Sequence, residues 1–215
     1  MGTVTNLIEA VDWLGYSYLY TRMMKEPQIY QIPVEDLEED KMLIKRRSNL
    51  IHSAALILNK NNLIRYDRRA GTFTPTTLGR IASHYYIKHP SIAVYSEHIR
   101  QDMDMIDLFR VFSLSAEFKY VPVRDSEKIE LENLLSLVPI PIRGTSDDPR
   151  TKINVLLQAH ISKMSLDGYV LKSDMVYVTQ SAARIMRGLF EVFIKRGWAN
   201  VANNCLQICK MIDKR

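Results

Sequence analysis

Residues 63–79 read LIRYDRRAGTFTPTTLG, and this stretch decides the fold of the first half of the chain. Residues 63–66 and 72–74 have the composition of short strands, and the intervening DRRAG at 67–71 is rich in turn-forming residues. The threonines that follow provide a hydroxyl that can cap a helix. The stretch therefore predicts a two-stranded hairpin followed by a helix.

Two helical patterns precede this hairpin. Residues 6–24 are rich in aromatic residues at helical spacing, and residues 37–59 form a second helical pattern that the acidic run 35–40 introduces. The order helix, helix, hairpin, helix is typical of a winged-helix domain, in which the hairpin is the wing. The same pattern also fits other small α+β domains that contain a hairpin.

The rest of the chain is helical in pattern. Five further helices are expected, over 102–112, 127–137, 149–162, 172–196 and 200–214. Prolines and a glycine mark the longest loop, between residues 139 and 149. The sequence thus predicts a mainly α protein, with a winged-helix domain over residues 1–100 and an α-helical bundle over residues 101–215.

Composition narrows the class of protein. The chain has 215 residues, of which 47% are hydrophobic and 25% charged, as in a globular protein. Its longest apolar runs fall short of the roughly 18 residues of a transmembrane helix, so a membrane partner is not expected. Cys205 and Cys209 are the only cysteines, which excludes a disulfide framework and indicates a reducing compartment. The formal net charge of +5 is compatible with a nucleic-acid partner.

Motifs for catalysis are missing from the sequence. No glycine is followed by lysine, so a phosphate-binding loop of the type Gly-x-x-x-x-Gly-Lys is excluded. The two cysteines lie one helical turn apart without further ligands at zinc spacing. No Gly-x-Ser-x-Gly elbow occurs. We therefore expect no catalytic residue, no metal ligand and no cofactor within this chain.

The long helix expected over 172–196 has one face that is more than apolar. Its polar arc contains Gln180, Ser181, Arg184 and Arg187, and Gly188 in the same arc would allow a backbone to approach closely. A basic stripe of this kind can follow a nucleic-acid backbone, because phosphate contacts need charge without base-specific geometry. The same residues also fit an ordinary solvated helix face.

The wing offers a second candidate surface. Arg65, Arg68 and Arg69 lie in or beside its turn, where they can contact a duplex as the wings of transcription factors do. Exposed turns also carry arginines without any ligand, so both interpretations stay open.

Several motifs, in order along the chain, resemble one family. They are LGRIASHYYI (78–87), FRVFS (109–113), KINVLLQA (152–159), DMVYVTQSA (174–182) and CKMIDKR (209–215). Together they are similar to superfamily-two RNA helicases with tandem cassettes, and in particular to the N-terminal cassette of the spliceosomal members found in the U5 small nuclear ribonucleoprotein. Thr77 and Ala183 depart from the family pattern, which has an acid and a glycine there.

The resemblance implies a role for each half of the chain. The winged-helix domain would pack on the two motor domains of the same polypeptide, and the bundle would contain the ratchet helix, here about 172–196. Single-stranded RNA would run along Gln180, Ser181, Arg184 and Arg187. ATP and magnesium would bind in the motor domains, which lie outside these 215 residues, so this chain is not expected to be active alone.

The implied function is that of a winged-helix and RNA-ratchet fragment of a nuclear, ATP-dependent RNA helicase. Such an enzyme unwinds U4/U6 small nuclear RNA when the spliceosome is activated for pre-mRNA splicing, together with other U5 particle proteins. Two alternatives remain open. One is the equivalent fragment of a related helicase of the activating signal cointegrator or DNA-repair type, and the other is a non-enzymatic winged-helix DNA-binding protein.

Overall fold

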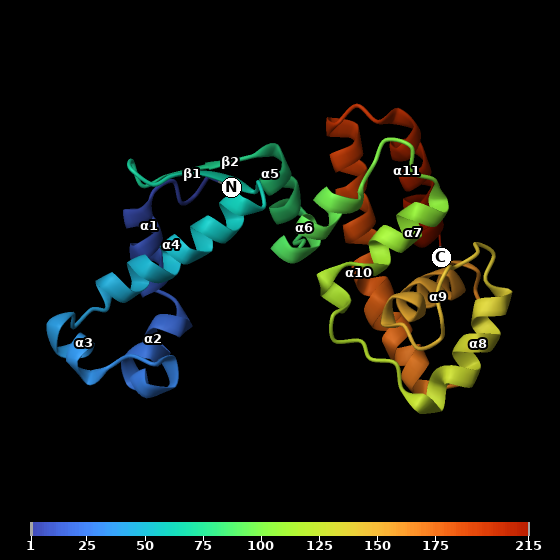
Figure 1. Cartoon of the computed structure of the whole chain (residues 1–215), viewed down its shortest axis with the longest axis horizontal. Helices are drawn as coiled ribbons and strands as arrows, with labels where there is room; N and C mark the ends of the chain where they lie inside the picture. Colours follow the sequence, from blue (N-terminus) through green and yellow to red (C-terminus); the bar gives the residue numbers. More distant parts are fainter. Residues whose placement is uncertain (1, 215) are drawn as a thin grey trace. The chain divides into compact units, whose positions relative to one another are not determined.

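The computed structural model describes residues 2–214, apart from the side chains of Val34 and Asp36. The chain divides into two compact units, residues 1–80 and residues 81–215. Within the described residues the only sheet is a two-stranded hairpin, and the other regular elements are helices. The predicted mainly α class, a winged helix with a short hairpin followed by a helical bundle, is confirmed (Figure 1).

The first unit is built around one long helix. Helix α4 (Ile44–Lys60) packs against α1 (Leu7–Gly15) and against strand β1 (Ile64–Asp67). β1 pairs in antiparallel fashion with β2 (Thr72–Pro75), so that Tyr66 lies opposite Phe73. The remaining elements are α2 (Tyr18–Lys25), the 3-10 turn η1 (Pro27–Tyr30), α3 (Val34–Glu39) and the start of α5 (Thr77–His84).

Local side-chain capping divides both helical patterns that precede the hairpin. Ser17 separates α1 from α2, because its hydroxyl donates to the Leu14 carbonyl at 2.6 Å and accepts the Tyr20 amide at 3.3 Å. The acidic run forms the separate helix α3 and does not open α4. Instead, the Asp40 carboxylate accepts the Lys45 amide at 2.7 Å, at the start of α4. Serine and aspartate favour such caps over continuous helix.

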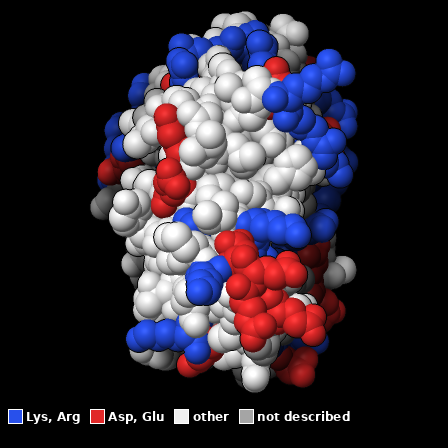
Figure 2. Space-filling view, turned by 90° about the vertical axis from the view of Figure 1, so that its left-hand side faces the viewer, with Lys and Arg blue, Asp and Glu red and all other residues white. Residues whose placement is uncertain are grey.

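The first unit buries little and exposes large apolar side chains. One of its core clusters is formed by Met23, Ile32 and Leu43. Figure 2 shows acidic side chains gathered in one patch on the face toward which α2 and α3 lie, beside separate groups of lysines and arginines. The exposed apolar residues of this unit include Ile8, Trp13, Tyr16, Tyr18 and Ile29.

The second unit is organised around α10 (Tyr169–Lys195), which is 27 residues long. It lies beside α11 (Ala199–Asp213) and also contacts α9 (Pro149–Ile161) and α7 (Met105–Ser113) (Figure 1). The other helical elements are α6 (His89–His98), α8 (Lys128–Leu137) and the 3-10 turns η2 (Ala116–Phe118) and η3 (Asp125–Glu127). Fully buried side chains such as Phe109, Phe112, Leu156, Val178 and Phe193 fill the space between them.

Helix α6 is an element that the sequence patterns did not predict. Its buried Ser91 donates to the Glu117 carboxylate of η2 and accepts the Ala116 amide at 2.8 Å, and the Tyr95 and Ser115 hydroxyls lie 2.6 Å apart. These contacts assign α6 to the second unit. The predicted domain boundary after residue 100 stays a prediction, and the compact units themselves meet at residues 80 and 81.

Candidate nucleic-acid interface along helix α10

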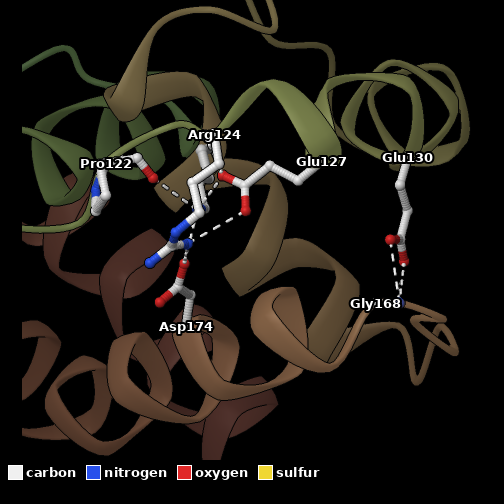
Figure 3. Close-up of polar contacts among 7 residues, drawn as sticks. Pro122, Arg124, Glu127, Glu130, Gly168 and Asp174 are labelled. Atoms are coloured by element: carbon white, nitrogen blue, oxygen red, sulfur yellow. Dashed lines mark hydrogen bonds and ion pairs between the residues drawn. The ribbon is translucent and has the colours of Figure 1, made fainter.

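The first turn of α10 is capped by a neighbouring helix. Gly168, at the N-cap position, has no side chain to bond the first free amides. The Glu130 carboxylate of α8 bonds the amides at the helix entry instead: it accepts the Asp167 amide at 2.7 Å and the amide of the N-cap residue Gly168 at 3.1 Å (Figure 3). A Cβ at residue 168 would lie 2.8 Å from Glu130 Oε2, so the carboxylate would have to shift if another residue stood there.

A cluster of four charges holds the next turns of α10; Lys152 and Glu127 are buried, Asp174 is half-buried and Arg124 is exposed. The Lys152 ammonium, which is fully buried, donates to the Pro122 carbonyl and to Asp174 Oδ2, each at 2.7 Å, and also to Glu127. Arg124 Nη1 lies 2.9 Å from the same Asp174 oxygen and 3.3 Å from Glu127 Oε2 (Figure 3). Two cations and two carboxylates balance, as buried charges require. The cluster therefore ties α10, through Asp174, to α9 and to η3.

Sequence reasoning missed this cluster as a structural feature. Lys152 and Asp174 lie in motifs that carry the family resemblance, but no spacing in the sequence joins them to Arg124 or Glu127. One signal in the sequence was Lys152 itself, because it directly precedes the mostly apolar run INVLLQA at 153–159, which the structure shows to be buried. A lysine buried beside such a run needs a paired carboxylate.

The opposite side of α10 is open to solvent. Five residues that follow one another at steps of three, four or seven on this side are exposed, and we call them the strip: Tyr169, Ser173, Val176, Gln180 and Arg187. Two of the four predicted RNA-contacting residues, Gln180 and Arg187, lie on it. Arg187 Nη2 contacts Asp213 of α11 at 2.6 Å, and both side chains of this pair are about half exposed (54% and 42%).

The other two predicted residues lie on a neighbouring flank of α10. Arg184 is half-buried, and its Nη1 donates to the Tyr86 carbonyl at 2.6 Å and to the Tyr85 carbonyl at 3.1 Å. Its Nη2 donates to the Ser181 hydroxyl at 3.2 Å. The structure therefore divides the predicted polar arc into an exposed part and a part that faces residues 85 and 86.

Gly188 belongs to the covered part of the arc. It is buried, and a Cβ built on it would lie 2.5 Å from Ile87 Cδ1 and 3.4 Å from Tyr85 Cβ. The sequence suggested that Gly188 allows another segment to approach α10 closely, and the groups that do so are the side chains of Ile87 and Tyr85 of the same chain.

The wing arginines are all exposed. The Arg68 guanidinium lies 3.0 Å from His52 Nε2, and His52 Nδ1 lies 2.9 Å from the Tyr66 hydroxyl, so Arg68 has a partner within its own unit. Arg65 stands on β1 opposite Thr74, and the Arg69 amide is bonded to the Asp67 carboxylate at 2.8 Å. The three guanidinium groups remain candidates for nucleic-acid contacts.

The described residues provide no metal-binding cluster, no exposed thiol and no membrane-spanning helix. Among residues 2–214, no group of three or more His, Cys, Asp or Glu side chains is placed to hold a metal ion. Both cysteines are buried, and the Cys205 thiol donates to the Met186 carbonyl at 3.3 Å. None of the described helices is long and apolar enough to cross a membrane.

Comparison with known families places this architecture. The family model of the Sec63 Brl domain matches residues 75–215, which include every element of the second unit. The chain belongs to the Sec63 Brl domain family. A second model, a winged helix-turn-helix domain, matches residues 1–60. The ion cluster, the strip and the flank with Arg184 therefore all lie in the Sec63 Brl segment.

Relatives from several organisms match over the whole of this chain. Among them are the DExH-box ATP-dependent RNA helicase DExH12 of Arabidopsis thaliana (56% identity), the U5 small nuclear ribonucleoprotein 200 kDa helicase of Homo sapiens (53%) and an activating signal cointegrator 1 complex subunit 3-like protein of Dictyostelium discoideum (52%). The chain covers 10% of the length of each. These matches confirm the resemblance to the spliceosomal helicases of the U5 particle.

Proposed function

We propose that this chain is the winged-helix and RNA-guiding portion of an ATP-dependent RNA helicase of the U5 small nuclear ribonucleoprotein, which unwinds U4/U6 small nuclear RNA in pre-mRNA splicing. The observation that carries the proposal is the 53% identity to the human U5 helicase over all 215 residues, because this single alignment includes both units in the same order along the chain. The proposed setting is the nucleus, among the other proteins of the U5 particle.

Within this portion, α10 is the proposed contact for single-stranded RNA. The strip supplies the groups that such a strand needs: Gln180 can donate and accept hydrogen bonds, Arg187 can meet a phosphate, and the Tyr169 ring is 85% exposed for stacking on a base. The capped first turn and the ion cluster support the proposal, because they hold the strip on a rigid helix.

The domains that would hydrolyse ATP to drive unwinding lie outside these 215 residues. ATP and magnesium would bind in motor domains of the same polypeptide, since these 215 residues contain no phosphate-binding loop. The exposed apolar side chains of the first unit, Trp13, Tyr16 and Tyr18 among them, support a role in packing against those domains.

One alternative function has an observation in its favour. The similarity to the Dictyostelium cointegrator subunit 3-like protein supports a helicase of the activating signal cointegrator type, which would use the same strip on another nucleic acid. Recovery of the full-length protein from cell extracts in particles without U5 RNA would favour this alternative.

The test is a double substitution in the full-length helicase, Gln180→Ala with Arg187→Ala. We expect unwinding of a U4/U6 duplex to fall at least about tenfold, while ATP hydrolysis without RNA is unchanged, because the strip contacts only the strand. The matched control, Arg100→Ala with Gln101→Ala at two exposed positions outside α10 and the wing, should unwind at the wild-type rate. Equal unwinding by the strip variant and the wild type would refute the proposed RNA path.

A further inference from the structure

One flank of α10 is covered by a short segment of the same unit. Ser181, Arg184 and Gly188 follow one another at steps of three and four on this flank, and residues 85–87 lie against them. Burial, together with a hydrogen bond to Glu191 one turn further along α10, raises the pKa of the Tyr85 hydroxyl. We call Ser181, Arg184, Gly188 and residues 85–87 the seam.

Residues 85–87 form the turn that follows the C-terminus of α5. The backbone conformation and the free carbonyl groups of this turn require contacts with neighbouring residues. Tyr86 has a left-handed backbone with φ of 52°, which is unfavourable for a bulky residue unless its surroundings hold it. The amides are satisfied within the turn, since the Ile87 amide donates to the Ala82 carbonyl at 2.8 Å and the Tyr85 amide to the Ile81 carbonyl at 3.0 Å. The carbonyls of Tyr85 and Tyr86 point beyond the helix end, where Arg184 meets both.

A guanidinium suits this place for two reasons. The carbonyl end of a helix carries partial negative charge, so a cation there stabilises it. The planar group also presents several donors in fixed directions, and Arg184 uses them on two carbonyls and one hydroxyl. Turning Arg184 toward a phosphate would leave the Tyr85 carbonyl and the Ser181 hydroxyl without this partner in a half-buried site, and it would also give up the exposed bond to Tyr86.

We infer that Arg184 is a positioning residue, which fastens residues 85–87 to α10, and that it is not a ligand of RNA. Ser181 orients its guanidinium, and Gly188 gives Ile87 and Tyr85 room to approach. The seam closes one flank of α10 and leaves the strip, with Gln180 and Arg187, as the open one. The part of this inference that concerns RNA rests on the proposed function.

The first experiment measures RNA binding by the full 215-residue chain. Anisotropy of a labelled twelve-nucleotide oligouridine is titrated at several KCl concentrations for the wild type and for the matched variants Arg184→Gln and Arg187→Gln. The logarithm of the affinity falls as the logarithm of the salt concentration rises. Loss of one phosphate contact makes this negative slope shallower by about 0.7 for a single strand. We expect that change for Arg187→Gln and an unchanged slope for Arg184→Gln.

The second experiment needs no RNA. Hydrogen exchange at the Tyr85 and Ile87 amides should become about tenfold faster in Arg184→Gln, because the turn loses charged hydrogen bonds, and should not change in Arg187→Gln. Ser181→Ala, which removes only the contact to Nη2, should give a smaller increase and serves if Arg184→Gln does not fold. These exchange results support the seam whether or not RNA binds.

The outcomes separate the two hypotheses. A wild-type chain that shows no salt-dependent binding of oligouridine counts against the proposed function, while the exchange data still decide the seam. The inference about Arg184 is overturned if Arg184→Gln makes the salt slope shallower by as much as Arg187→Gln does and leaves exchange at Tyr85 and Ile87 unaltered.

Discussion

Among the described lysines and arginines, Arg47 in the first unit and Lys152 in the second are buried, and they have very different surroundings. In the first unit, Arg47 on α4 is 5% exposed; its Nη1 donates to the Val11 carbonyl at 2.8 Å, and its guanidinium lies 4.8 Å from the centre of the Tyr20 ring. Its Nε has no hydrogen-bond partner among the described residues. In the second unit, Lys152 meets the two carboxylates of Glu127 and Asp174.

The two buried cations show how far each unit satisfies its own charged and apolar groups. The second unit neutralises its buried charge and surrounds it with a filled core, so it provides a self-sufficient scaffold for α10. The first unit leaves its buried cation without a paired carboxylate in the part of the chain that the structure describes, and it exposes several large apolar side chains. This contrast agrees with a first unit whose surface is completed by partner domains.

The largest loss of stability is expected when Lys152, the buried cation that is paired with two carboxylates, is replaced. Lys152→Met leaves the Glu127 and Asp174 carboxylates facing a site without their cation, which should lower the free energy of unfolding of the second unit by about 3–5 kcal/mol. Urea unfolding followed by Trp198 fluorescence, in a Trp13→Phe background, measures this unit.

The exposed Lys195→Met is the matched control, and its unfolding should stay within about 0.5 kcal/mol of the wild type. A loss below about 1 kcal/mol in Lys152→Met would mean that the ion cluster does not hold α10 in place.

A smaller effect is expected for the other buried cation. Arg47→Met removes one charged hydrogen bond and a ring contact, but it also removes the unsatisfied Nε, so the first unit should lose only about 1–2 kcal/mol. Trp13 fluorescence in a Trp198→Phe background reports this unit, and the exposed Lys45→Met is the control. A loss as large as that of Lys152→Met would show that the contrast between the two cations is false.

The sequence predicted those elements whose signals are local. The hairpin follows from the turn chemistry of residues 67–71, and α10 follows from the helical period of the predicted segment 172–196, although the helix begins three residues earlier, at Tyr169. The division of α1 from α2 was missed because one serine at position 17 outweighs the helical spacing around it. Helix α6 was missed because neither of its faces is clearly apolar, and its place depends on contacts with η2.

The candidate site was predicted only in outline, for a related reason. Periodicity finds the polar arc of α10, but it does not tell which part of the arc another segment covers. Tyr85, which decides that question for Arg184, lies 99 positions earlier in the sequence. The same distance effect hid the cluster of Lys152 and Asp174, whose other members precede Lys152 by 25 residues or more.

The smallest effect concerns the one strip residue that has a charged partner. If Arg187 binds RNA as proposed, Asp213 competes with RNA for it, and because the Arg187–Asp213 pair is about half exposed it should contribute only about 0.2–1 kcal/mol. Asp213→Asn should therefore strengthen oligouridine binding by the full chain by about two- to fivefold at low salt, while the free energy of unfolding falls by no more than about 1 kcal/mol. Asp102→Asn, an exposed substitution with the same change of charge, separates this release of Arg187 from a general gain of positive charge. If both variants bind alike, Arg187 does not need to leave Asp213 to reach RNA, and the strip ends at Gln180.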